Sequence, residues 1–289
     1  SSAIINGKEI GAEIRKSVEK RVIALKEKGI TPGLAVILVG DNPASKTYVA
    51  NKQASCEAIG MYSALIKLPE DISEKALLEQ IRELNVRADI HGILVQLPLP
   101  KHIDENAVIA TISPEKDVDG FSPISVGKMM LGQETYLPCT PYGVMKLLEY
   151  SGIGVSGKHA VIVGRSHIVG KPMGQLLLQK DATVTYTHSK TVDLASYTKQ
   201  ADILIAAVGR PNFITADYIK EGAVVIDVGI NRDENNKLVG DVDFASVDGI
   251  ASYITPVPGG VGPMTITMLL ENTVQAAEKT VKSDNKQLI

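Results

Sequence analysis

Apolar residues in this chain follow two different spacings. Short continuous apolar runs predict strands that are buried on both faces, whereas apolar residues three and four positions apart predict helices with one buried side. In the first half of the chain the two patterns alternate, which predicts a parallel sheet covered by helices. The expected strands are residues 34–39, 63–68 and 92–97, and the expected helices are residues 8–28, a helix that includes 44–52, and 73–84.

The same alternation returns after an interruption. Residues 113–138 are rich in loop signals and are expected to cross between two domains. Beyond them the expected strands are 159–164, 183–187, 203–208 and 223–228, the expected helices are 141–150, 170–179, 194–199 and 264–279, and a hairpin is expected at 231–242. This order is typical of the doubly wound, Rossmann-type nucleotide-binding fold. The 289 residues are enough for two α/β domains with parallel sheets.

Composition narrows the classes of function. Charged residues make up 22% of the chain, the net charge is -3 and the pI is near 6.0, so no basic surface for nucleic acid or anionic lipid is indicated. The apolar runs fall far short of the ~20 residues that a membrane-spanning helix needs. We therefore expect neither a nucleic acid partner nor a membrane.

The few cysteines and histidines give no sign of a metal site. Cys56 and Cys139 have neither metal-ligand spacing nor partners for a disulfide framework, and the five histidines form no i, i+4 pair and no cluster with acids. Residues 1–4 do not begin a secretory signal pattern. Together these features favour a reducing, cytoplasmic location.

A phenol and an amine stand four residues apart in the segment 44–52. If this segment is helical, Tyr48 and Lys52 share one face, and residues 41–43 supply turn and cap chemistry before it. The segment follows an expected strand, and the carboxyl ends of strands border the ligand crevice of an open α/β sheet. Two interpretations remain: an ordinary solvated helix face, or a pair of side chains directed at a ligand.

Two other polar residues also fit either a structural or a functional role. Gln96 interrupts an apolar strand near its carboxyl end, where a buried amide needs hydrogen-bond partners. Its partners are either neighbouring backbone groups or Lys52 across the crevice. Asp119 precedes Gly120 in a common turn dipeptide, and its carboxylate can equally accept paired N–H groups of a ligand.

Two glycine-rich loops each precede an expected helix. In residues 164–172, Gly164 and Gly170 allow a tight turn, and the helix N-terminus favours phosphate. The spacing does not match G-x-G-x-x-G, so a purely structural turn remains possible. Residues 256–263 would bring bare backbone to a ligand or form only a rigid turn.

The end of the next strand favours NADP over NAD. An NAD-binding fold places an acidic residue there for the ribose hydroxyls, whereas this chain has His188, Ser189 and Lys190. Hydroxyl and cationic groups suit a 2′-phosphate, and Arg165 can add a bidentate contact. The alternative is a solvated turn with an incidental lysine.

Taken together, five segments resemble the bifunctional methylenetetrahydrofolate dehydrogenase/methenyltetrahydrofolate cyclohydrolase family over essentially the whole chain. They are residues 44–52 (ASKTYVANK), 91–100 (HGILVQLPLP), 116–120 (KDVDG), 163–172 (VGRSHIVGKP) and 256–265 (PVPGGVGPMT). The resemblance implies a multifunctional enzyme of one-carbon metabolism and purine biosynthesis. Such an enzyme oxidises 5,10-methylenetetrahydrofolate with NADP and hydrolyses the methenyl product to 10-formyltetrahydrofolate.

The resemblance also implies how the chain is organised. Residues 1–140, completed by the C-terminal helix 264–289, would form a folate-binding catalytic domain. Residues 141–263 would form a Rossmann-type NADP-binding domain. The active cleft would lie between the two domains, and the protein would be a homodimer.

By the same resemblance, Lys52 is the catalytic lysine, Tyr48 lies against the folate, Gln96 hydrogen-bonds the lysine and Asp119 anchors the pterin ring. Substrate contacts are also implied for Leu97, Pro258, Gly259 and Gly260, and cofactor contacts for Gly164, Arg165, Ser166, Ile168, His188, Ser189, Lys190 and Ile230. Many relatives have arginine where this chain has Lys190. Because lysine makes only a single-point contact with phosphate, strict NADP selectivity is less firmly implied.

Other functions predict other residues. Two-domain NADP dehydrogenases that act on shikimate-like or amino-acid substrates share the strand order, but not Lys52, Gln96 and Asp119 in these contexts. A nucleotide sensor would keep residues 164–172 and have no reason to keep Tyr48 beside Lys52. Within the family, a dehydrogenase without cyclohydrolase activity is the nearest alternative, and the presence of Lys52 argues against it.

Overall fold

The computed structural model describes the backbone of residues 1–287 and the side chains of residues 1–283. This part of the chain forms two compact units. Residues 1–12 and 138–268 form the first, which we call the six-stranded unit. Residues 13–137, with the described residues from 269 onward, form the second, which we call the three-stranded unit.

This division differs from the expected domain boundaries at both ends of the chain. Residues 1–12 and 264–268 group with the six-stranded unit rather than with the rest of residues 1–140 and 264–289. The cause at the N-terminus is strand pairing, because β1 (Ala3–Ile4) is a parallel partner of β11 (Tyr253–Ile254). Strands of two residues have no periodicity in the sequence, so neither strand was predicted.

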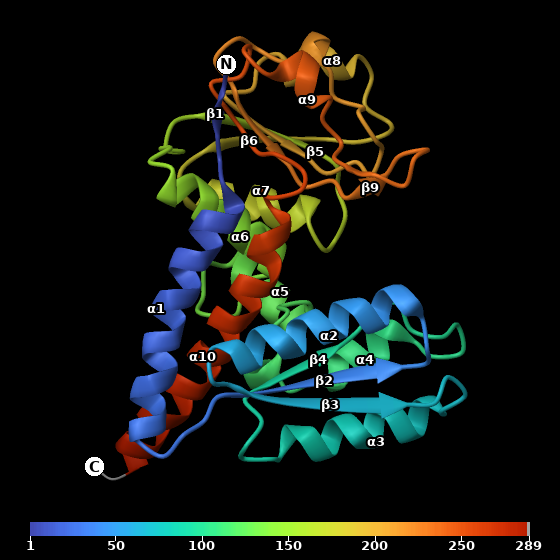
Figure 1. Cartoon of the computed structure of the whole chain (residues 1–289), viewed down its shortest axis with the longest axis vertical. Coiled ribbons are helices and arrows are strands. Elements are labelled where there is room, and N and C mark those ends of the chain that lie inside the picture. The colour runs from blue at the N-terminus through green and yellow to red at the C-terminus, as the bar shows by residue number, and fades with distance from the viewer. Residues whose placement is uncertain (288–289) are drawn as a thin grey trace. The chain divides into compact units, whose positions relative to one another are not determined.

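The three-stranded unit is built on parallel strands in the order β3-β2-β4. These strands are Tyr62–Leu68, Gly33–Val39 and Gly92–Val95. α2 (Pro43–Ala58) connects β2 to β3, and α3 (Glu74–Asn85) connects β3 to β4. The connection from β2 to β3 crosses the sheet in one direction, and the connection from β3 to β4 crosses it in the other. Because both crossovers are right-handed, α2 and α3 lie on opposite faces of the sheet, as Figure 1 shows.

Burial of both faces of β2 explains its continuous apolar sequence. Ala35 and Ile37 belong to one core cluster with Leu77 and Ile81 of α3 and with Val108 of α4 (Glu105–Thr111). The intervening residues of β2 are buried as well, on the face that carries α2. A strand covered on both sides must be apolar throughout, as the sequence predicted.

Residues 113–138, which are rich in loop signals, also contain helical turns that were not predicted. This segment contains a short 3-10 helix, η1 (Pro114–Lys116), and α5 (Pro123–Met130). Ser122 caps α5, since its Oγ accepts a hydrogen bond from Ser125 N at 3.2 Å, and Pro123 occupies the first turn. A helix of eight residues is too short to show a clear period in the sequence.

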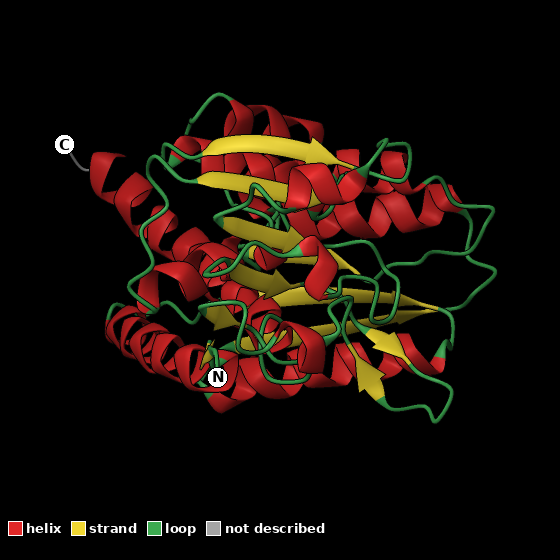
Figure 2. Ribbon diagram, turned by 90° about the horizontal axis from the view of Figure 1, so that it is seen from above, coloured by secondary structure: helices red, strands yellow, loops and turns green. Residues whose placement is uncertain are grey.

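The six-stranded unit contains a parallel sheet in the order β1-β11-β8-β7-β5-β6. Figure 2 shows helices flanking the strands, so the predicted fold class of two α/β domains with parallel sheets, the second of Rossmann type, is confirmed. The remaining strands are β5 (His159–Val163), β6 (Thr183–Thr187), β7 (Ile203–Ala206) and β8 (Val224–Asp227), with the antiparallel pair β9 (Asn231–Arg232) and β10 (Leu238–Val239). The remaining helical segments are α6 (Cys139–Tyr150), α7 (Gly170–Gln179), α8 (Leu194–Thr198), η2 (Ala216–Tyr218) and α9 (Phe244–Val247).

Two long helices, α1 (Gly7–Glu27) and α10 (Gly262–Gln287), contribute residues to both units. Within the three-stranded unit, Arg21 of α1 forms ion pairs with Glu271 and Glu278 of α10. In the part of the chain that the structure describes, no helix has the length and apolar content to cross a membrane.

Candidate functional site

The connections of the three-stranded sheet leave a crevice at the carboxyl end of its central strand. β3 lies on one side of β2 and β4 on the other, so the loops after β2 and β4 diverge, and such a switch point is where open α/β sheets bind ligands. Lys52 stands on α2, which follows β2, and Gln96 directly follows β4. Lys52 Nζ donates a hydrogen bond to Gln96 Oε1 at 2.7 Å, so the structure brings these two predicted residues together.

Local sequence explains why α2 presents Lys52 to this crevice. Asn42 caps the helix, its Oδ1 accepting from Ser45 N at 3.0 Å, and a proline occupies the first turn. The buried residues Ser45, Val49 and Cys56 lie on the side of the helix that faces the sheet. Lys52 is half-buried near that side. The solvated-face interpretation therefore fails for the lysine.

Tyr48, one turn before Lys52 on α2, is 53% exposed. Its ring therefore offers an open aromatic surface and fills no place in the core. A ring in this position can stack on a flat ligand that enters the crevice. Its contact with folate stays a prediction.

Gln96 combines both roles that its position in the sequence allowed. Its backbone N–H donates to Ile37 O at 2.9 Å, and its side-chain Nε2 donates to Leu97 O at 3.1 Å. The amide is thereby oriented, and its oxygen is left to accept from Lys52. No carboxylate among the described residues forms an ion pair with Lys52, so the lysine's one hydrogen-bonded side-chain partner is neutral.

The turn that carries Asp119 is held rigidly. Asp117 is 2% exposed, and its Oδ2 accepts from Ser122 N at 3.0 Å and from Ser125 Oγ at 2.7 Å. Val118 packs directly on β4: a Cβ added at Gly92 would lie 2.8 Å from Val118 Cγ1. Glycine at position 92 is therefore required for the turn to sit this close to the strand.

Asp119 itself is partly accessible but closely surrounded by protein atoms. The pKa of its carboxyl group is raised to about 6, mainly because of burial; the positive charge of Lys52 lowers the pKa and the negative charge of Asp117 raises it, and both effects are smaller than that of burial. The positive charge of Lys52 thus acts on the carboxyl group of Asp119. With a pKa of about 6, this carboxyl group is mostly ionised at pH 7 and can accept hydrogen bonds.

A cavity of about 450 Å³ opens at the corresponding place in the six-stranded sheet. β5 has β6 on one side and β7 on the other, so the switch point lies between the loops after β5 and β7. Its lining comes from the ends of β5, β6 and β7 and from residues near η2. The lining residues are Val163, Gly164, Arg165, Ser166, His188, Ser189, Thr191, Leu194, Ala207, Val208, Arg210, Phe213 and Tyr218.

Five of the eight predicted cofactor residues line this cavity, namely Gly164, Arg165, Ser166, His188 and Ser189. Ile168, Lys190 and Ile230 do not line it, and their contacts stay predictions. Sequence reasoning missed Arg210, whose guanidinium lies 5.5 Å from the ring of Phe213. The only available signal was its position just after a buried strand.

The cavity suits a phosphorylated dinucleotide such as NADP. It is lined by two arginines and by no acidic residue. Gly164, with φ +129°, lets the turn after β5 pass close to the segment after β7, since an added Cβ would lie 2.2 Å from Ala207 O. Ser166 Oγ accepts from Val169 N at 3.1 Å and so organises the turn before α7. The donors and the open backbone match an anionic ligand.

The loop of residues 256–263 lies in the six-stranded unit. Gly7 N donates to Gly259 O at 2.8 Å, and a Cβ at Gly7 would lie 1.7 Å from Gly260 O, so the loop packs directly on the start of α1. Pro258 at its tip is exposed. The substrate contacts of Pro258, Gly259 and Gly260 stay predictions, as does that of Leu97.

Comparison with known families gives two matches that together cover most of the chain. Residues 5–119 match the model of the tetrahydrofolate dehydrogenase/cyclohydrolase catalytic domain. Residues 138–281 match the model of the tetrahydrofolate dehydrogenase/cyclohydrolase NAD(P)-binding domain.

Individual relatives agree with these models over nearly their full length. The bifunctional protein FolD of Lysinibacillus sphaericus is 82% identical over 96% of this chain and 98% of its own length. The structure of the bifunctional FolD methylenetetrahydrofolate dehydrogenase/cyclohydrolase from Campylobacter jejuni has a TM-score of 0.96 at 53% identity, covering 97% of this chain and 100% of that one. The Trypanosoma brucei enzyme, complexed with NADP and an inhibitor, has a TM-score of 0.91 at 40% identity, covering 97% and 98%.

Proposed function

Because the chain belongs to the tetrahydrofolate dehydrogenase/cyclohydrolase family, we propose a division of labour between the residues described above. The enzyme is bifunctional and acts in folate one-carbon metabolism. With NADP+ it oxidises 5,10-methylenetetrahydrofolate to 5,10-methenyltetrahydrofolate, which it then hydrolyses to 10-formyltetrahydrofolate. The observation that carries our assignment of roles is the hydrogen bond between Lys52 and Gln96.

In the oxidation, the chain's residues bind and orient the reactants. Bound NADP+ supplies the hydride acceptor. Arg165 and Ser189 bind the phosphate groups of the cofactor, and the ring of Tyr48 supports the folate. No proton has to leave the one-carbon bridge in this step, so no base is needed.

In the hydrolysis, water adds to the methenyl carbon, and Lys52 takes a proton from that water. The bond between this carbon and N5 then breaks, and the proton is returned to N5, which leaves the formyl group on N10. A cationic substrate beside the ammonium group favours loss of the lysine's proton. Gln96 holds the amine in place without a counter-charge, whereas a carboxylate there would keep the lysine protonated. Asp119 accepts hydrogen bonds from the paired N–H groups of the pterin ring.

Replacement of Lys52 by methionine tests this assignment. We expect K52M to lose cyclohydrolase activity by a factor of about 10² to 10⁴, the usual contribution of a general base, while NADPH is still formed. Both activities are followed in one spectrophotometric assay, from NADPH and from the rise and decay of the methenyl chromophore. Lys46, which is 51% exposed on the same helix, gives the matched control K46M. If K52M hydrolyses the methenyl compound as fast as K46M does, Lys52 is not the base.

Two further proposals concern assembly and location. We propose that the enzyme is a homodimer, and the open edge strand β3 of the three-stranded sheet offers a surface for a second copy. Light scattering should then give twice the mass of 30.9 kDa. A cytoplasmic location is supported by the two buried cysteines, Cys56 and Cys139, which are not joined in a disulfide.

A further inference from the structure

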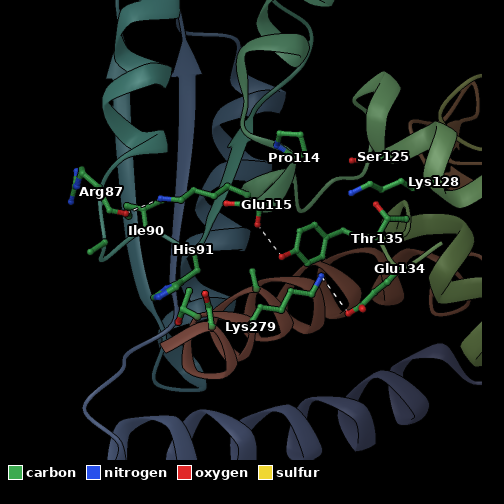
Figure 3. Close-up of a pocket in the computed structure, with 16 residues that line it drawn as sticks. Arg87, Ile90, His91, Pro114, Glu115, Ser125, Lys128, Glu134, Thr135 and Lys279 are labelled. Atoms are coloured by element: carbon green, nitrogen blue, oxygen red, sulfur yellow. Dashed lines mark hydrogen bonds and ion pairs between the residues drawn. The ribbon is translucent and has the colours of Figure 1, made fainter. Parts of the chain in front are cut away.

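A second cavity, of about 480 Å³, lies at the amino-terminal edge of the three-stranded sheet. It is lined by the loop that leads into β4, by η1, α5 and residues 134–136, and by the end of α10 (Figure 3). His91 directly precedes β4, whereas Gln96 directly follows it. The two residues are thus separated by the length of the strand, roughly 15 Å. This cavity is distinct from the candidate folate site.

Cationic side chains outnumber carboxylates around this cavity. The cations are Arg87, Lys116, Lys128 and Lys279, and the carboxylates are Glu115 and Glu134. Two of the cations already have their partners inside the protein. The fork of Arg87 binds Asp89 at 3.0 and 2.8 Å, and Lys116 Nζ donates to Leu84 O at 3.1 Å and to Arg87 O at 2.8 Å.

The other two cations can reach a ligand. Lys128, at the end of α5, is exposed and forms no ion pair with a residue of the described chain. Lys279 of α10 lies over the ring of Tyr136, with 4.4 Å between Nζ and the ring centroid. Its distance of 3.6 Å to a carboxylate oxygen of Glu134 is long for a charged hydrogen bond. Lys128 and Lys279 come from different segments, as Figure 3 shows.

His91 adds a buried donor. The residue is 6% exposed, and its Nδ1 accepts a hydrogen bond from Gly33 N at 3.0 Å, which places the ring proton on Nε2. Burial lowers the pKa of His91, and the nearby Lys116 lowers it further, so the ring is neutral at pH 7. No acceptor in the described part of the chain takes the Nε2 proton. Because His91 lines the cavity, its Nε2–H is available to donate to a ligand there.

We propose that this cavity binds a small organic phosphate. A tetrahedral oxyanion accepts hydrogen bonds from several directions, which suits the Nε2–H of His91 and the ammonium groups of Lys128 and Lys279. A carboxylate is matched best by an arginine fork, and the fork of Arg87 is occupied. The cavity volume falls within the range of about 300 to 1,000 Å³ typical of small-molecule sites, which leaves room for an organic group beside Ile90.

Titration of the full chain with methyl phosphate, followed by amide NMR at constant ionic strength, tests the proposal. We expect saturable shifts at residues 87–91 and 276–283. Signals of residues 164–166 and 188–191 report entry into the cofactor cavity separately, so the two sites are distinguished. Succinate, a carboxylate dianion, should bind at least tenfold more weakly in the second cavity. Equal binding of succinate, or no shift at residues 87–91 and 276–283, would overturn the proposal.

Two variants separate specific recognition from general charge. In H91N the amide oxygen can replace Nδ1 as acceptor for Gly33 while the Nε2 donor is lost, so phosphate affinity should fall about tenfold with little change in the unfolding temperature. K128E should weaken binding at least as much. Lys282 is an exposed lysine of α10 that does not line the cavity. K282E is therefore the control, and an equal loss of affinity in K282E would show that only overall charge matters.

Discussion

Lys52 Nζ and Gln96 Oε1 are joined by a 2.7 Å hydrogen bond across the switch point of the three-stranded sheet. The second hydrogen bond of the Gln96 amide, to Leu97 O, fixes which side of the amide faces the lysine. The amine thus has a positioned but uncharged partner. This arrangement holds the lysine in place through a neutral hydrogen-bond acceptor.

Replacement of Gln96 by glutamate changes only the charge of that partner. We expect Q96E to lower cyclohydrolase activity at least tenfold near pH 7, because a carboxylate at hydrogen-bond distance keeps the lysine protonated. The methenyl intermediate should then accumulate while NADPH formation continues, and absorbance of the intermediate measures this directly. Decay of the methenyl absorbance at the wild-type rate would show that neutrality at position 96 is unimportant.

The raised pKa of Asp119 predicts how substrate binding depends on pH. A carboxyl group with a pKa of about 6 is mostly ionised at pH 7.5 and mostly protonated at pH 5, where it no longer accepts two hydrogen bonds. The KM for methylenetetrahydrofolate should therefore rise roughly tenfold when the pH is lowered from 7.5 to 5. In D119N the KM should be high at both. A wild-type KM that is flat over this range would contradict the pterin-anchoring role.

The same shift predicts the pH dependence of folding. The folded-state pKa of Asp119 lies above the unfolded value of about 4, so between pH 4 and 6 the folded state binds more protons and stability falls as pH rises. In D119N no carboxyl group ionises at this position, so the fall in stability with rising pH should disappear. The free energy of unfolding of D119N should exceed that of the wild type by up to about 3 kcal/mol at pH 7, and the two should be equal near pH 4. Urea unfolding at both pH values measures it. Exposed Asp217 supplies the control D217N, for which no such trend is expected.

Much of the fold could be predicted from the sequence because its signals are local. Strands β2 and β5 are continuous apolar runs, and α1 has a long helical period, so their existence follows from the chain itself. The pairing of β1 with β11 joins two-residue strands about 250 positions apart, and no local pattern encodes it. Short α5 lies in a region that reads as loop.

The candidate site was harder to predict because it depends on strand order. Lys52 and Gln96 lie 44 positions apart in the sequence. They are in contact because β4 pairs with β2; in a sheet of order β2-β3-β4 they would be separated by β3. Periodicity does not specify this order, so the residues alone left two partners open for Gln96, backbone groups or Lys52, and the family resemblance favoured Lys52. Arg210 was missed for the same reason, since its place in the cofactor cavity follows from β7 being the neighbour of β5.

Ser189, which lines the cofactor cavity after β6, determines cofactor preference if the 2′-phosphate binds there. S189D places a carboxylate where NAD-binding folds have one, so it should repel the phosphate and accept the ribose hydroxyls. We expect the KM for NADP+ to rise at least tenfold, the KM for NAD+ to fall, and the KM for folate to stay unchanged. Ser196, exposed on α8 and outside the cavity lining, gives the control S196D. If S189D and S196D use NADP+ equally well, the phosphate is bound elsewhere, and the same assay on R210Q tests Arg210 as the alternative contact.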